Sequence, residues 1–157
     1  MYLTMQKSAR RSLRIWKENK MDKEKRLELL NLAIKARKNA YIPYSHFGVG
    51  AAALFESGKI YTGCNIENIA FGSTICAERT AIVKAASEGE RKLVAIAVVG
   101  GPENGELLPV CEPCGACRQV MSEFSDGDME IIFGSSEDDM TVYTLNDILP
   151  MRVGFTL

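Results

Sequence analysis

Apolar residues recur at helical spacing near the start of the chain, in residues 23–40. The stripe is formed by Leu27, Leu30 and Ile34, and more loosely by Leu29 and Ala33. The positions between them are mostly charged, so the pattern predicts an amphipathic helix that covers a sheet. Asp22 stands directly before this helix, where its carboxylate can cap the first turn.

Five shorter apolar runs have the length of strands. They are residues 49–55, 60–65, 93–99, 130–133 and 141–144. The first two flank a turn that contains glycine, and together they predict a β-hairpin. The third is almost wholly apolar and rich in β-branched residues, which is typical of a strand buried on both faces.

Three further helical segments lie between and after these runs. They are expected at residues 76–87, from Pro113 to about residue 124, and at residues 145–149. The order of elements predicts an α/β protein with a mixed sheet of about five strands between helices, which is a three-layer α/β/α sandwich. Right-handed crossovers allow the helices that begin at residues 76 and 113 to lie on one face, with their N-termini close together.

Composition and charge narrow the class of protein. The chain has 157 residues, and 46% of them are hydrophobic, which is enough for the core of one domain at residues 21–157. No apolar run approaches the roughly 20 residues that a membrane-spanning helix needs. The net charge of −1 gives no general reason to expect nucleic acid as a partner. We therefore expect a soluble, cytoplasmic protein without a membrane or nucleic-acid partner.

Residues 1–20 differ in charge from the rest of the chain. Six basic residues and Glu18 give this segment a charge of +5, against −6 for the remainder. The basic residues are Lys7, Arg10, Arg11, Arg14, Lys17 and Lys20. We interpret the segment as a disordered or non-native extension, since Met21 resembles a natural start. An organelle transit peptide and a basic arm for nucleic acid are the alternatives.

Two cysteines three residues apart predict a metal site. Cys114 and Cys117 project from one face of a helix, so both sulfurs can reach one ion. Pro113 suits the first helical position, because its fixed φ matches the helix and its missing N–H would have no partner there. The positive end of the helix dipole favours thiolates, which are the form of cysteine that binds metal.

A third cysteine begins another predicted helix, and Glu78 follows it two residues later. Cys76-Ala77-Glu78, taken with Pro113-Cys114-Gly115-Ala116-Cys117, resembles the signature of the zinc deaminases. In those enzymes zinc activates water to attack a nucleobase ring, and a glutamate that is not a ligand moves the protons. Because the first ligand is cysteine rather than histidine, the closer resemblance is to cytidine deaminases that act on the free nucleoside.

The resemblance runs from about residue 23 to residue 150 and implies a function. It implies hydrolysis of cytidine and deoxycytidine to uridine and deoxyuridine with release of ammonia, a step of pyrimidine salvage. It also implies a small homotetramer with one Zn²⁺ in each subunit. Phe155 lies later than the aromatic residue with which such enzymes reach a neighbouring subunit's site.

The resemblance assigns roles to particular residues of this chain. They are Cys76, Cys114 and Cys117 as zinc ligands, Glu78 as the catalytic acid and base, Asn65 and Glu67 on the ribose, Phe47 on the base, the Ala77 N–H on the base carbonyl, and Arg79 as a donor to the ligand sulfurs. Arg118, which directly follows Cys117, is a second candidate donor to the sulfurs.

Spacing alone leaves other uses of these residues open. Cys111, Cys114 and Cys117 form a C-x-x-C-x-x-C run that could bind an iron–sulfur cluster. A closed structural zinc site would need a fourth protein ligand, and a binding module held by zinc would have no need of Glu78. Disulfides are disfavoured, because the five cysteines are odd in number and no secretory signal is visible. The single histidine, His46, is expected to be a solvated loop side chain.

Other substrates also remain as alternatives. A related deaminase could act on another aminopyrimidine, such as an aminonucleoside antibiotic. A deaminase that edits polynucleotides is disfavoured, because strand binding needs a basic groove with stacking aromatic residues and the core of this chain is acidic.

Overall fold

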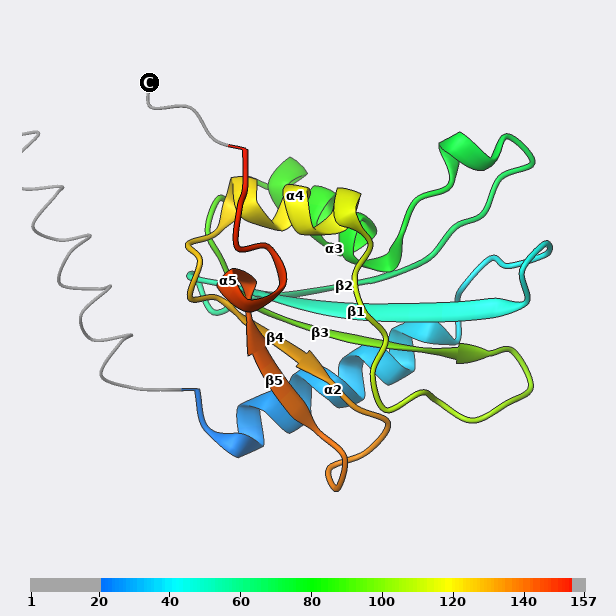
Figure 1. The fold of residues 1–157 in the computed structure, drawn as a ribbon, viewed down its shortest axis with the longest axis horizontal. Helices are drawn as coiled ribbons and strands as arrows, with labels where there is room; N and C mark the ends of the chain where they lie inside the picture. Colours follow the sequence, from blue (N-terminus) through cyan, green and yellow to red (C-terminus); the bar gives the residue numbers. More distant parts are fainter. Residues whose placement is uncertain (1–20, 154–157) are drawn as a thin grey trace, which may run out of the picture.

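Five strands form one mixed sheet in the computed structural model, which describes residues 21–153 (Figure 1). The strands are β1 (Phe47–Phe55), β2 (Ile60–Cys64), β3 (Leu93–Pro102), β4 (Glu130–Phe133) and β5 (Thr141–Thr144). Their order across the sheet is β2-β1-β3-β4-β5. β1 is antiparallel to β2 and to β3, β3 is parallel to β4, and β4 is antiparallel to β5. The predicted hairpin and mixed sheet are confirmed.

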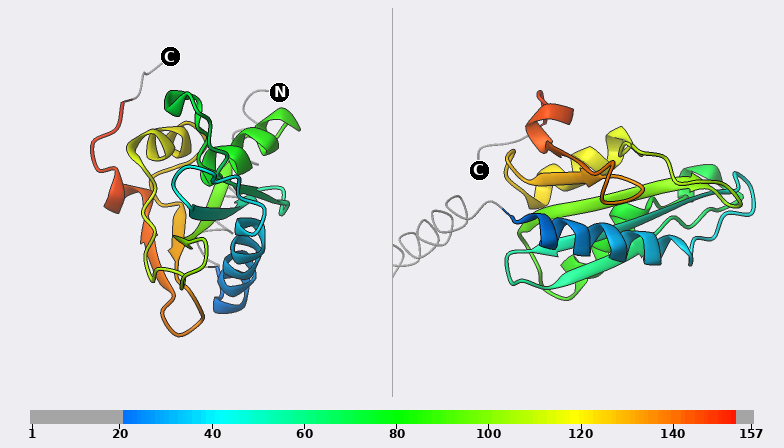
Figure 2. Two further views of the ribbon diagram at one scale, coloured as in Figure 1. Left: turned by 90° about the vertical axis from the view of Figure 1, so that its right-hand side faces the viewer. Right: turned by 90° about the horizontal axis from the view of Figure 1, so that it is seen from below.

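Helices cover both faces of this sheet. The helices are α2 (Lys23–Arg37), α3 (Ala77–Ser87), α4 (Gly115–Phe124) and α5 (Leu145–Ile148), and a 3₁₀ turn occupies Phe71–Ser73. Figures 1 and 2 show α2 alone on one face, with α3, α4 and α5 on the other. The three-layer α/β/α sandwich is therefore confirmed. None of the helices within residues 21–153 is long and apolar enough to cross a membrane.

The strand β3 separates two hydrophobic cores. Ile96 and Val98 pack into the core under α3 and α4, whereas Ala95, Ala97 and Val99 pack into the core under α2. This alternation follows the two-residue period of a strand. Every residue of β3 except its last is buried, as the almost wholly apolar sequence predicts.

The helix α2 has the predicted cap and a slightly different apolar face. The Lys25 N–H donates to Asp22 Oδ1 over 2.7 Å, which confirms the cap. Leu29, Leu30 and Ala33 are fully buried, whereas Leu27 and Ile34 are only partly buried against the same core. Of the predicted stripe only Leu30 is fully buried, whereas Leu29 and Ala33, which the sequence pattern marks more loosely, are both fully buried.

Several boundaries differ from the sequence prediction. α2 ends at Arg37 rather than at residue 40, and β1 begins at Phe47 rather than at residue 49, because Phe47 pairs with Pro102 of β3. The prediction that Pro113 is the first helical residue is wrong. α4 begins at Gly115, and Cys114 is its N-cap, with an extended φ of −64° and ψ of 164°. Residues 1–20 and Phe155 lie outside the described residues.

The topology explains why α3 and α4 share a face. β2 and β3 run parallel to each other, since both are antiparallel to β1, and β3 runs parallel to β4. α3 connects β2 to β3, and α4 connects β3 to β4, so both crossovers step across the sheet in the same direction. Two right-handed crossovers of this kind place their helices on the same face. Both helices also begin beyond the carboxyl ends of strands, where α/β sheets bind ligands.

Gly50 allows α2 to lie close against β1. A Cβ atom at this position would overlap the Ala33 carbonyl oxygen and would lie 2.6 Å from the Arg37 backbone nitrogen. Both of these are backbone atoms of α2, and they cannot move aside as the end of a side chain can. The absence of a side chain at Gly50 therefore sets the distance between this helix and the sheet.

We expect Gly50→Ala to lower the free energy of unfolding by about 1–3 kcal/mol, the usual cost of overpacking a core. The matched control is Gly72→Ala, since a Cβ atom at Gly72 would have no neighbour within 4 Å. Urea denaturation followed by circular dichroism measures both variants. Equal unfolding midpoints for Gly50→Ala and the wild type would contradict the close packing.

Candidate active site

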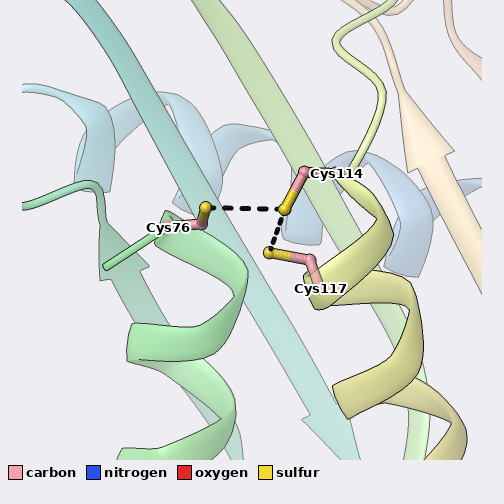
Figure 3. A group of neighbouring side chains, drawn as sticks. All are labelled: Cys76, Cys114 and Cys117. Atoms are coloured by element: carbon pink, nitrogen blue, oxygen red, sulfur yellow. Dashed lines mark hydrogen bonds between the residues drawn. The ribbon is translucent and has the colours of Figure 1, made fainter. Parts of the chain in front are cut away.

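Three cysteine sulfurs meet where α3 and α4 begin (Figure 3). Cys76 is the N-cap of α3, Cys114 is the N-cap of α4, and Cys117 lies on the first turn of α4. The three sulfurs all lie within 4.8 Å of one another. The structure thus brings together the three cysteines that the sequence motifs single out.

The spacing of these sulfurs fits a zinc ion. The Sγ atoms of Cys76 and Cys114 are 3.8 Å apart, and those of Cys114 and Cys117 are 3.5 Å apart. A tetrahedral ion with Zn–S bonds of about 2.3 Å would hold its sulfurs about 3.8 Å from each other. Three thiolates also leave one of four tetrahedral positions free of protein ligands, as catalytic zinc sites do. Within residues 21–153, no fourth cysteine, histidine or carboxylate joins this group.

Gly63 on β2 brings α3 to its position against the sheet. A Cβ atom at Gly63 would lie 2.5 Å from the Ala77 carbonyl oxygen and 2.5 Å from the Ala81 nitrogen. Both are backbone atoms of the first turns of α3. The close approach carries Cys76, at the tip of this helix, toward Cys114.

Hydrogen bonds stabilise negative charge on Cys76. The thiol of Cys117 and the guanidinium of Arg79 both donate to its sulfur, and they lower the pKa of Cys76 to about 5. Arg79 Nη2 lies 3.3 Å from Cys76 Sγ and 3.2 Å from the Thr74 carbonyl oxygen. The hydrogen bond to Cys76 raises the pKa of Cys117, because its proton is shared with the Cys76 thiolate, and burial raises it further. Arg79 therefore lies where the resemblance places a donor.

Arg118 does not donate to the sulfurs, so that prediction is wrong. Its Nε donates to the Pro113 carbonyl oxygen over 2.8 Å, and its Nη1 donates to the Ile148 carbonyl oxygen over 2.7 Å. Arg118 thus ties the residue before Cys114 to the end of α5. Its side chain supports the loop that carries a ligand rather than the ligand sulfur itself.

Glu78 is a buried acid beside these cysteines. It lies in the first turn of α3, and only 3% of its surface is exposed. Burial raises its pKa to about 7, and the negative charge of Cys76 contributes to this shift. A carboxyl group with a pKa near neutrality can both accept and release a proton under ordinary conditions.

Asn65 and Glu67 follow the end of β2 and hold the loop that leads into β1. Asn65 Nδ2 donates to the Phe47 carbonyl oxygen over 2.9 Å, and its Oδ1 accepts from the Val49 N–H over 2.8 Å. Glu67 Oε2 accepts from the N–H groups of Tyr44 and Ser45, at 3.0 and 3.2 Å. Hydrogen bonds, first of all from the Ser45 hydroxyl, lower the pKa of Glu67. Glu67 therefore holds the backbone and the side chain of this loop through its carboxylate.

A cavity lies beside Glu67. Its volume is about 360 Å³, and Tyr44, Ser45, Glu67, Phe71 and Thr74 line it. This size is within the range of small-molecule sites. Thr74 connects the cavity to the cysteines, because its carbonyl oxygen accepts from Arg79. No sequence motif marks Tyr44, Ser45, Phe71 or Thr74 as site residues, because only the fold brings these loop residues together.

The remaining candidates lie apart from the three sulfurs. Cys64 is buried on β2. Cys111 is half-buried, and its sulfur and the Phe47 ring both lie against Gly100. Cys111 does not belong to the sulfur group, so the structure gives no support to an iron–sulfur cluster. His46 is exposed, and its Nδ1 lies 3.0 Å from Glu103 Oε2.

A family model, related sequences and a solved structure all match this chain. Residues 23–135 match the family model described as the cytidine and deoxycytidylate deaminase zinc-binding region. A cytidine deaminase from Sporosarcina psychrophila is 50% identical over 130 residues, which are 83% of this chain and 90% of that protein. A cytidine deaminase from Halalkalibacterium halodurans is 49% identical over 122 residues, which are 78% of this chain and 89% of that protein.

A solved structure also resembles this one. The crystal structure of cytidine deaminase from Burkholderia pseudomallei superposes with a TM-score of 0.71 and is 42% identical. The match covers 80% of this chain and 97% of that one. Sequence and backbone therefore agree on one family.

We expect the purified protein to hold one zinc ion per chain, measured by atomic emission after dialysis. Cys76→Ala, Cys114→Ala and Cys117→Ala should each weaken zinc binding by more than about 100-fold, because losing a ligand costs more than losing a residue that supports one. Cys111→Ala is the control and should keep its zinc. Retention of zinc by Cys117→Ala, or its loss from Cys111→Ala, would contradict this assignment.

Proposed function

Because the chain belongs to the cytidine and deoxycytidylate deaminase family, we propose that it hydrolyses cytidine and deoxycytidine to uridine and deoxyuridine, with release of ammonia. The observation that carries the proposal is the position of Glu78. This acid is buried in the first turn of α3, and its carboxylate interacts with Cys76 and Cys117. A structural zinc site would have no need of a buried acid at this place.

Glu78 moves the protons of the proposed reaction. Zinc held by Cys76, Cys114 and Cys117 would supply a Lewis acid that makes water nucleophilic at neutral pH. Glu78 takes a proton from the attacking water as the water oxygen bonds to C4 of the pyrimidine, and it gives that proton to N3. It then carries the second proton to the amine, the C4–N bond breaks, and ammonia leaves. A pKa of about 7 suits both transfers.

The nucleoside is held by residues from two loops. The carboxylate of Glu67 and the second N–H of Asn65 can bind the ribose hydroxyls, while their hydrogen bonds to the backbone keep the loop in place. Phe47 packs against the base, and the Ala77 N–H, at the start of α3, binds the base carbonyl. Both assignments rest on the family resemblance.

Arg79 balances the charge of the zinc ligands. Three thiolates on Zn²⁺ carry a net charge of −1, which makes the ion a weaker Lewis acid than one held by neutral imidazoles. The hydrogen bond from Arg79 to Cys76 and the two helix N-termini offset this charge. The proposed role of Arg79 is therefore electrostatic, and it acts through the ligands.

Glu78→Gln should keep its zinc and its fold but lose activity by a factor on the order of 10² to 10⁴, because glutamine has the same shape and cannot carry the protons. The assay follows the ultraviolet change as cytidine becomes uridine. Glu88→Gln is the matched control, since Glu88 lies at the far end of α3. It should keep near wild-type activity.

Two outcomes would contradict the proposal in different ways. Full activity in Glu78→Gln would remove Glu78 from the mechanism. A folded, zinc-loaded wild type that leaves both cytidine and deoxycytidine unchanged would point to another aminopyrimidine substrate or to a structural zinc site.

We also propose that the protein works as a homotetramer. Large apolar side chains are exposed on the loop between β2 and α3, with Ile69 80% and Phe71 75% accessible in the single chain. Exposed apolar clusters of this kind mark surfaces that associate. Sedimentation equilibrium should give four times the mass of one chain, and the mass of a single chain would contradict the assembly.

The proposed compartment is the cytoplasm, with a role in pyrimidine salvage. All five cysteines are free thiols, and three of them would hold zinc as thiolates. Free thiols are typical of proteins in reducing compartments, whereas disulfides form in oxidising ones.

A further inference from the structure

Among residues 21–153, the partners of Arg37, the last residue of α2, are all main-chain carbonyls. Its Nε donates to the Gly48 carbonyl oxygen over 2.9 Å. Its Nη2 donates to the carbonyl oxygens of Gly101 and Pro102, at 2.8 and 2.6 Å. Arg37 forms no ion pair with any carboxylate in residues 21–153. A guanidinium used in this way acts as a fixed fork that joins backbone segments.

The three carbonyls belong to the first residues of β1 and the last residues of β3. Gly48 pairs with Gly101 across the two strands, and Phe47 pairs with Pro102. Arg37 thus joins the start of β1 to the end of β3, at the point where Phe47 enters β1. The chain that leaves β3 at the same point leads toward Cys111 and then to the zinc ligand Cys114.

Phe47 is held from the opposite side by Asn65. The Asn65 amide bonds the Phe47 carbonyl oxygen and the Val49 N–H, and the Arg37 guanidinium bonds the Gly48 carbonyl oxygen between them. Three consecutive residues are therefore fixed by two side chains, one from α2 and one from the end of β2. The Phe47 N–H is also bonded, since it donates to Ser45 Oγ over 3.0 Å.

The backbone just before Phe47 needs such support. His46 has a φ of 54°, which makes it the only residue other than glycine with a positive φ in the described part of the chain. A non-glycine residue in this region costs on the order of 1 kcal/mol and persists only where the surroundings hold it. The contacts of Arg37 and Asn65, which begin at the next residue, fix the strand into which this turn feeds.

We propose that Arg37 is a positioning residue for substrate binding: by fixing the start of β1 and the end of β3, it sets the place of the Phe47 ring against the base. The proposal rests on the proposed function, in which Phe47 packs on the pyrimidine. Arg37 itself does not touch the substrate. Its loss should therefore affect binding of the nucleoside more than the proton transfers at Glu78, which lies on a different helix.

The test compares Arg37→Met with Lys35→Met, which removes a neighbouring exposed charge from the same helix turn. For Arg37→Met we expect the KM for cytidine to rise about tenfold, the effect of losing one aromatic contact. The kcat and the zinc content should stay close to wild type, because the variant removes binding and not chemistry. Lys35→Met should match the wild type in both constants.

Arg37→Lys shows whether the guanidinium fork or only its charge is needed. Lysine keeps the charge and the stem, but one ammonium cannot bridge three carbonyls as the fork does. Its KM should therefore rise as well, and it also serves if Arg37→Met does not fold. A KM within about twofold of wild type in a folded Arg37→Met or Arg37→Lys, or a fall in kcat without a change in KM, would overturn the proposal.

Hydrogen exchange measured by mass spectrometry gives a second readout that needs no substrate. In the Arg37 variants, the peptide that spans residues 44–50 should exchange faster than in the wild type, while the peptide of α3 should not change. Unchanged exchange in residues 44–50 would overturn the proposal whatever the activity. A zinc-loaded wild type that leaves cytidine unchanged would instead overturn the proposed function, and the exchange rates would then decide whether Arg37 holds this segment.

Discussion

The placement of three cysteine sulfurs at one point is the constraint on which the rest of the structure depends. Sulfurs only 3.5 and 3.8 Å apart repel one another once they are thiolates, so the site needs compensating positive charge. Two helix N-termini supply part of it, because Cys76 and Cys114 are the N-caps of α3 and α4. The fold brings these two helix ends to one place, so that both act on the same group of sulfurs.

The sheet topology meets this requirement without any contact specific to the metal. The strands β2, β3 and β4 are parallel to one another, and the two right-handed crossovers between them place α3 and α4 side by side. The glycine at position 63 then lets α3 approach the sheet, which carries Glu78 into the interior together with Cys76. The burial that raises the pKa of Glu78 to about 7 thus follows from the same packing that positions a ligand.

Sequence reasoning was most successful where the chemistry is local. The period of the apolar residues predicted the sheet, the layers and the helix that Asp22 caps. The spacing of Cys114 and Cys117 predicted two of the three sulfurs, and the resemblance to the zinc deaminases added Cys76. Helix starts were less predictable, because Pro113 is compatible with the first helical position and also with the position before the cap, where the structure has it. The roles of Arg118 and Arg37 could not be predicted, since their partners are carbonyls of Ile148 and Gly101 that are distant in sequence.

The proposed substrate residues illustrate why a binding site depends on residues that never meet the ligand. Asn65 and Glu67 both form hydrogen bonds to the backbone of residues 44–49. These bonds fix the direction of the polar atoms with which the two side chains would bind the ribose. The same backbone carries Phe47, and Arg37 fixes it from the other side. The ribose and base contacts are therefore coupled through one short segment. A substitution at Arg37 would therefore weaken binding of the sugar as well as of the base, because both sets of contacts depend on the position of the start of β1.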